Sequence, residues 1–161
     1  MVFVIAAVAG GTGAGAGIYY FAGQRTPAGS GALEIEISDS TGSPRDTFSL
    51  GQRVYWRISL VNPGPGPAVY QGSSCVAYAT PYDEKREAMD GVACPADHVR
   101  REFPAGRTEV SRGDWDQVCR WNCSDLQMNW PVPPGEYFLW EWAAGTLDGK
   151  ETRVESWFRI A

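Results

Sequence analysis

The sequence has little histidine and little lysine, and both shortages exclude classes of function. His98 is the only histidine in 161 residues, so a site that needs two imidazoles, such as a mononuclear blue-copper centre, is excluded. Lys85 and Lys150 are the only lysines, and 19 acidic residues outnumber 14 basic ones. A nucleic-acid binder needs a basic face that competes for phosphates. We therefore predict that nucleic acid is not a partner.

The sequence also lacks the motifs of hydrolytic enzymes. A Ser-His-Asp triad would have to use His98, and no nucleophile elbow surrounds a serine. Asp114 and Asp116 flank Trp115 and would be near enough for a carboxylate pair, although a turn or surface position is the favoured interpretation. We expect no catalytic residue and hence no enzyme.

One possible metal motif is incomplete. Cys119 and Cys123, followed by Met128, have a spacing similar to the binuclear copper loop of oxidase subunits. Gln127 stands where that loop needs a histidine. Because an even number of cysteines in an exported domain usually forms disulfides, we expect neither a metal nor another cofactor.

Residues 2–22 contain no charged side chain. A helix of this length reaches about 31 Å at about 1.5 Å per residue, enough to cross the hydrocarbon core of a bilayer. Tyr19, Tyr20 and Phe21 cluster near its end, and aromatic rings favour the headgroup layer. The sequence therefore predicts a transmembrane helix over residues 1–23, which anchors a single-pass cell-membrane protein in the lipid bilayer.

Three other interpretations of this segment need features that are missing or incomplete. A cleaved signal peptide needs a basic start, which is absent, although residues 28–32 offer the small side chains of a cleavage site. A dinucleotide-binding glycine loop needs a following helix and strand, yet the chain continues into glycines and prolines. An amphipathic surface helix needs a polar face. The transmembrane helix is favoured, and the cleaved signal peptide stays the alternative.

The glycines of this segment predict helix packing. Gly11 and Gly15 are four residues apart, and so are Gly13 and Gly17. Small residues at this spacing let another transmembrane helix approach backbone to backbone. Each glycine also weakens a helix by up to about 1 kcal/mol relative to alanine, so their number calls for a reason. We favour contact with a partner helix over a helix that faces only lipid.

After residue 23, helical periodicity is scarce and turn residues abound. Residues 24–32 are rich in Gly, Ser, Pro and Ala and predict a flexible linker, so one domain is expected over 33–161. Leu33, Ile35 and Ile37 alternate with polar residues and should face a core. Strands separated by turn residues predict an all-β, two-sheet sandwich. They are expected at 33–37, 53–61, 135–142 and 152–160, with shorter strands near 68–71, 75–80 and 107–111.

Two stretches of the domain resemble a known family. The first, Phe48–Cys75, reads FSLGQRVYWRISLVNPGPGPAVYQGSSC, and the second, at 133–142, reads PPGEYFLWEW and precedes a last strand. The pattern is similar to that of intracellular proteinase inhibitor (BsuPI-type) and related bacterial Ig-like domains, while the Cys-bearing middle, 77–129, departs from it. The resemblance implies an Ig-like antiparallel β-sandwich and, as an alternative function, proteinase inhibition.

All four cysteines lie in the expected β domain. Among three possible pairings we favour Cys75 with Cys94 and Cys119 with Cys123. Disulfides form outside the reducing cytoplasm, so the domain is expected on the periplasmic or exoplasmic side of the membrane. The positive-inside rule adds little, because Arg25 lies on the domain side of the helix.

An interaction surface is expected in the Cys-bearing middle of the domain. Aromatic and arginine side chains dominate the hot spots of protein interfaces. The competing interpretation is that individual tryptophans of this region fill the core. The candidates are Arg112, Trp115, Arg120, Trp121 and Trp130.

Together these features predict a non-catalytic accessory subunit of a larger membrane complex. Its helix would pack among other subunits, and its β domain would cap them on the exoplasmic face. Photosynthetic reaction-centre–antenna complexes and respiratory complexes are candidate hosts, although no residue identifies one. The alternative is a membrane-tethered proteinase inhibitor of BsuPI type.

Overall fold

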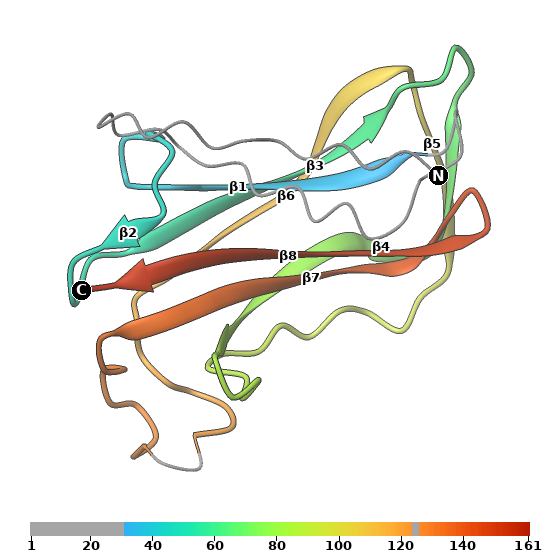
Figure 1. Ribbon diagram of the computed structural model, residues 1–161. Coiled ribbons are helices and arrows are strands. Elements are labelled where there is room, and N and C mark those ends of the chain that lie inside the picture. The colour runs from blue at the N-terminus through green and yellow to red at the C-terminus, as the bar shows by residue number, and fades with distance from the viewer. Residues whose placement is uncertain (1–30, 124–125) are drawn as a thin grey trace, which may run out of the picture.

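The computed structural model describes residues 31–123 and 126–161, apart from the side chains of residues 141 and 142. Every element in this part of the chain is a β-strand (Figure 1), which confirms the predicted all-β class. The strands are β1 (Ala32–Ser38), β2 (Thr47–Phe48), β3 (Val54–Asn62), β4 (Ala68–Asp83), β5 (Val99–Phe103), β6 (Gly106–Trp115), β7 (Gly135–Leu147) and β8 (Lys150–Ile160).

The predicted transmembrane helix over 1–23 lies outside the described residues, together with Gly11, Gly13, Gly15 and Gly17 and the linker up to residue 30. Within 31–123 and 126–161, no helix has the length and hydropathy needed to cross a bilayer.

The strands form two sheets that pack face to face (Figure 1). One sheet has three strands in the order β1-β3-β6, and the other has five in the order β2-β8-β7-β4-β5. Neighbouring strands are antiparallel except for β2, which runs parallel to β8. Apolar side chains from both sheets, such as Ile58 of β3 and Leu139 of β7, meet in one buried cluster.

Alternation along β1 places its side chains as the sequence predicts. Leu33 and Ile37 are buried, and Ile35 packs against the core in a half-buried position. Glu34 and Glu36 point to the other face, where they pair with arginines of β6 and β3. Burial of one face and ion pairing on the other fix the register of this strand, because a slip by one residue would exchange the two faces.

Two features of the five-stranded sheet differ from the sequence-based expectation. β4 is one strand of 16 residues, where two short strands were expected, because an irregularity between Gly72 and Ala77 bends it without ending it. β5 was not expected, because Val99–Phe103 has four polar or half-exposed positions and forms a strand only by pairing with the edge of β4. The turn expected at 147–149 is confirmed, with Asp148 and Gly149 both at positive φ.

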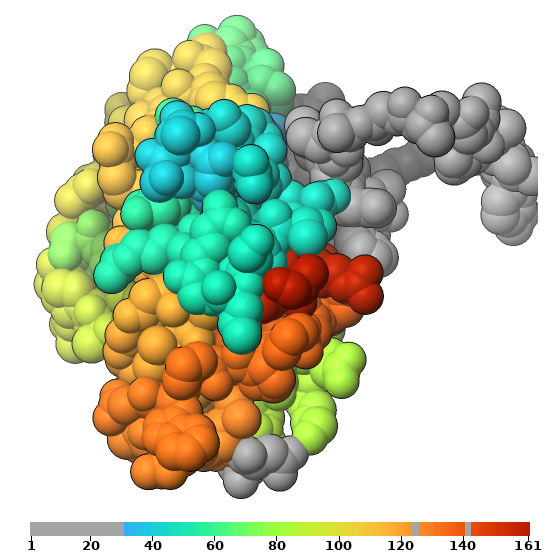
Figure 2. All heavy atoms as spheres, turned by 90° about the vertical axis from the view of Figure 1, so that its left-hand side faces the viewer, coloured from blue at the N-terminus to red at the C-terminus, as the bar shows by residue number. Residues whose placement is uncertain are grey.

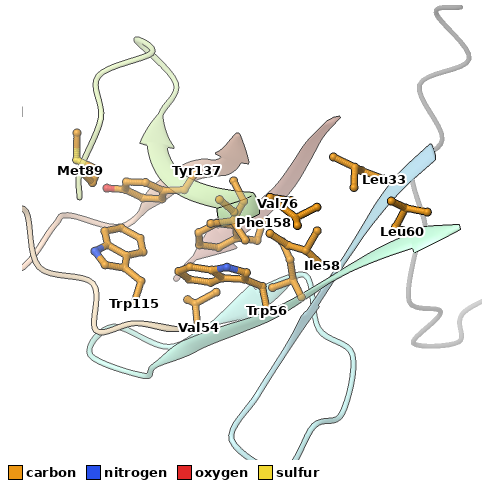
Figure 3. Packing of buried hydrophobic residues seen from close by; sticks show 14 of the residues in the cluster. Leu33, Val54, Trp56, Ile58, Leu60, Val76, Met89, Trp115, Tyr137 and Phe158 are labelled. Carbon is orange, nitrogen blue, oxygen red and sulfur yellow. The ribbon is translucent and has the colours of Figure 1, made fainter. Parts of the chain in front are cut away.

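The core contains a cluster of aromatic rings contributed by both sheets (Figure 3). The ring of Trp115 lies 5.6 Å from that of Tyr137, and the ring of Phe158 lies 5.8 Å from that of Phe48. Trp115 is 1% exposed, so its assignment to an interaction surface is wrong and the competing core interpretation is right. As the last residue of β6, it pairs with Val54 and turns its side chain toward the opposite sheet.

Two glycines allow the paired strands β4 and β7 to approach each other closely. Gly72 and Gly145 are register partners, and neither position has room for a side chain. A Cβ at Gly145 would collide with the carbonyl oxygen of Gln71, and one at Gly72 would lie 2.5 Å from the Cα of Gly145. Both obstacles are backbone atoms, which cannot rotate away as the tip of a side chain can.

We predict that Gly145→Ala lowers the free energy of unfolding by about 2 kcal/mol, because the added methyl group must push two backbones apart. Denaturant unfolding of the full-length chain, followed by tryptophan fluorescence, measures this change. Gly66→Ala is the matched control, since nothing lies within 4 Å of a Cβ there. Equal unfolding midpoints for the two variants would contradict the close approach of β4 and β7 at Gly72 and Gly145.

Candidate interaction surface

The connection from β6 to β7, residues 116–134, exposes large apolar side chains. Trp121 is 67% exposed, and Met128 and Trp130 are each 58% exposed. We call these three residues the tryptophan surface. Figure 2 shows the end of the molecule at which this connection, drawn in orange, protrudes beyond the loops that follow β1 and β2. Exposed side chains of this size concentrate at interaction sites.

A disulfide and its neighbouring hydrogen bonds hold this connection in shape. Cys119 is fully buried and is bonded to Cys123, with 6.2 Å between their Cα atoms. Its N–H donates to the carbonyl of Trp130 (3.0 Å), and its carbonyl accepts from the N–H of Asn129 (2.7 Å). Cys119 therefore ties the segment that carries Trp121 to the segment that carries Trp130.

The segment after β4 forms a second support. The N–H of Arg120 donates to the carbonyl of Met89 (2.7 Å), and the N–H of Asn122 donates to that of Ala88 (3.0 Å). A Cβ on Gly91 would lie 2.9 Å from the ring of Trp121, so the indole packs directly on the glycine backbone. These contacts position an exposed tryptophan from a neighbouring loop that is itself anchored by the buried Met89.

The side chain of Arg120 links the two loops by charge. Its guanidinium pairs with Asp116 (2.5 Å) and with Asp90 (3.2 Å). The hydrogen bonds from Arg120 lower the pKa of Asp116, and the same bonds raise the pKa of Arg120. Both groups therefore stay charged at neutral pH, and Arg120 positions the loop as well as lining its surface.

The buried amide of Gln117 fixes the base of the connection. Its Oε1 accepts from the N–H of Gly51 (2.6 Å), and its Nε2 donates to the carbonyls of Ser49 (3.0 Å) and Gln52 (2.6 Å). Gln117 is fully buried and has a φ of 62°. Nothing in the local sequence marks this residue, because its partners are backbone groups about 65 residues earlier in the chain.

The structure brings together only part of the predicted surface. Arg120, Trp121 and Trp130 share the 116–134 connection, with Trp115 buried at its start. Arg112 instead lies within β6, opposite Arg57 of β3, where its guanidinium pairs with Glu109. Sequence reasoning considered Met128 only beside the incomplete copper motif and did not assign it to this surface, although a methionine between two tryptophans in a loop without periodicity was a usable signal.

The cysteines pair as the sequence analysis favours. The second disulfide joins Cys75 to Cys94, with 5.6 Å between their Cα atoms, and ties the segment after β4 back onto that strand. In residues 31–123 and 126–161, no three His, Cys, Asp or Glu side chains gather as a metal site. Asp114 of the suggested carboxylate pair forms an ion pair with Arg53, and Asp116 pairs with Arg120.

Comparison with known proteins gives no family. No protein-family model matches the chain, and no curated protein matches it. Three solved structures align with the chain at 10–13% identity and TM-scores of 0.37–0.40, and similarity this low carries no argument. The chain aligns over 82% of its length with 30% of the Pseudomonas fluorescens alkylpurine DNA glycosylase AlkC. It aligns over 84% with 97% of the putative ApaA protein of Bordetella pertussis, and over 82% with 49% of the Bacillus subtilis sporulation control protein Spo0M.

We predict that replacing Cys119 and Cys123 together by serine loosens the connection while the sheets stay folded. Loss of so short a closed loop should lower the free energy of unfolding by about 2 kcal/mol. Hydrogen exchange at the amides of Arg120 and Asn122 should accelerate by about tenfold or more, because their bonds to the neighbouring loop open more often. Amides of β3 are the internal reference. An unchanged exchange rate at Arg120 would show that the hydrogen bonds to Ala88 and Met89 hold the connection in place without the disulfide.

Proposed function

We propose that the chain is a non-catalytic accessory subunit of a larger membrane complex and that the tryptophan surface docks on neighbouring subunits. The observation that carries the proposal is the rigid support of side chains that remain exposed. A disulfide and two hydrogen bonds between loops hold the backbone around Trp121. In a domain without a partner, fixing the position of an exposed side chain adds little to stability. A docking surface gains directly, because side chains fixed before binding lose less conformational entropy when a partner covers them.

The positions of the two ends of the domain support a partner outside the membrane. In the three-stranded sheet, Ala32 pairs with Val61 at one end, while Trp115 pairs with Val54 at the other. Val54 and Val61 of β3 separate these ends by about 23 Å at about 3.3 Å per residue. A membrane helix over 1–23 would enter the domain at Ala32. The tryptophan surface would then lie at the end of the domain farther from this entry point, within reach of extramembrane parts of other subunits.

The two-sheet, mainly antiparallel arrangement supports the finer assignment to an Ig-like β-sandwich. The proposal places this sandwich on the periplasmic or exoplasmic side, where its two disulfides would persist. Photosynthetic reaction-centre–antenna and respiratory complexes stay candidate hosts. A membrane-tethered proteinase inhibitor of BsuPI type is the second candidate function, and it rests on the sequence pattern of 48–75 and 133–142.

We predict that replacing Trp121 and Trp130 together by alanine releases the chain from its complex. Truncation of two exposed aromatic anchors should lower the yield of co-purified subunits by about tenfold or more. Gentle detergent extraction followed by native electrophoresis measures this loss. Arg101→Ala, an exposed position on the edge strand β5, is the control. A wild-type chain that runs alone and inhibits serine proteinases would instead favour the inhibitor.

The same assay separates the contribution of the helix. Gly15→Leu should also release the chain, because in a membrane the close approach of two helices decides their association. Val8→Leu is the control of similar bulk. If Gly15→Leu co-purifies as well as the wild type, the helix is only a tether and the tryptophan surface carries the association alone.

A further inference from the structure

The outer faces of the two sheets differ in chemistry. The three-stranded sheet turns ion pairs outward, such as Glu36 with Arg57 and Glu109 with Arg112. The five-stranded sheet carries aromatic rings on the corresponding face. They belong to alternate positions of three neighbouring strands: Tyr78, Tyr82, Phe138, Trp140 and Trp157.

These rings pack on one another outside the core. The ring of Phe138 lies 5.4 Å from that of Tyr82 and 4.6 Å from that of Trp157. The ring of Tyr82 also lies 5.4 Å from that of Trp140. Phe138 is fully buried although its neighbours along β7 point to the opposite, core side. An aromatic layer of this kind offers ring faces to any group that settles on it.

The layer already holds one cation from its own chain. The guanidinium of Arg86 lies 5.2 Å from the ring centre of Phe138 and 5.7 Å from that of Trp140. Both of its terminal nitrogens bond Glu155, at 3.0 Å and 3.3 Å. Arg86 has a φ of 64°, a conformation that a residue with a side chain rarely adopts. This arrangement shows how the surface binds a guanidinium: ring faces beneath it and a carboxylate beside it.

A hollow of about 300 Å³ shares the ring of Trp140 with the surroundings of Arg86 and likewise combines aromatic rings with an acidic residue. Tyr78, Tyr82 and Trp140 line it from the sheet, and Trp121 lines it from the 116–134 connection. Asp90, in the segment after β4, also lines it, and its Oδ1 accepts a hydrogen bond from the N–H of Gly91 (2.8 Å). Burial raises the pKa of Tyr78, so its ring is neutral at neutral pH.

The charge of the hollow favours a cation. Asp90 and Asp116 share the single guanidinium of Arg120, and Arg120 makes its shorter contact with Asp116. The three groups together therefore carry one negative charge, and Asp90 is the carboxylate that lines the hollow. An anionic occupant would meet this carboxylate and the negative faces of the rings.

We propose that this hollow binds an arginine side chain of a basic segment on a partner protein. The planar guanidinium stacks on the aromatic rings, as that of Arg86 lies over Phe138 and Trp140, and donates hydrogen bonds to the carboxylate of Asp90. The site goes beyond the proposed docking through the tryptophan surface. Because it is a property of the chain by itself, it is measured without the complex.

The test is an NMR titration of the full-length chain with the blocked tripeptide acetyl-Gly-Arg-Gly-amide, following the indole N–H signals of Trp121 and Trp140. We expect saturable shifts of both signals that weaken as salt is added. The citrulline analogue, which has the same shape without the charge, should bind about fivefold more weakly. Equal affinity for the two tripeptides overturns the proposal, and so does the absence of saturable shifts.

Variants locate the site. Asp90→Asn and Trp121→Leu should each weaken binding of the arginine tripeptide by about fivefold, because one removes the carboxylate charge and the other a ring. Trp130→Leu is the matched control, since Trp130 does not line the hollow. Equal weakening by Trp121→Leu and Trp130→Leu overturns the assignment. Tetramethylammonium that binds as tightly as the arginine tripeptide also overturns it, in favour of a quaternary-ammonium headgroup.

Discussion

Individual side-chain and backbone contacts hold the connection between β6 and β7 in one shape. The ladder of hydrogen bonds that stabilises a sheet is missing there, because the described residues of the connection form only a single bridge, between Val118 and Pro131. Gln117 bonds three backbone groups of the preceding loop, Cys119 joins two segments of the connection, and Arg120 binds two carboxylates. The inward positions are taken by apolar residues such as Val132. Trp121 and Trp130 remain exposed, and backbone hydrogen bonds at or beside each of them hold their position.

Alternation and turn chemistry were enough to predict the framework of the fold. β1 and β3 each show apolar residues at every second position, and Asp148-Gly149 is a turn that few other residue pairs form. The edge strand β5 escaped prediction because its pairing with β4, and not its own sequence, makes it a strand. The favoured cysteine pairing, one of three that four cysteines allow, is the one in the structure.

The candidate surface was predictable only in part. Trp115 and Trp121 are six positions apart in the same aromatic-rich stretch, yet one is 1% exposed and the other 67% exposed. In a segment without a period, nothing local separates a core tryptophan from an exposed one. The aromatic outer face was more accessible to sequence reasoning. β7 has apolar residues on both of its faces, Tyr137 and Leu139 on one and Phe138 and Trp140 on the other, which indicates a strand covered on both sides.

We propose that neighbouring subunits cover the tryptophan surface in the native complex, outside the bilayer. Hydroxyl-radical footprinting tests it most directly, by comparing the oxidation of Trp121 and Trp130 in native membranes with that in the purified chain. Tyr55, a half-exposed residue on β3 of the three-stranded sheet, is the reference. The account predicts that oxidation of both tryptophans falls severalfold in membranes while that of Tyr55 is unchanged. Equal oxidation of Trp121 and Trp130 in the two samples would contradict it.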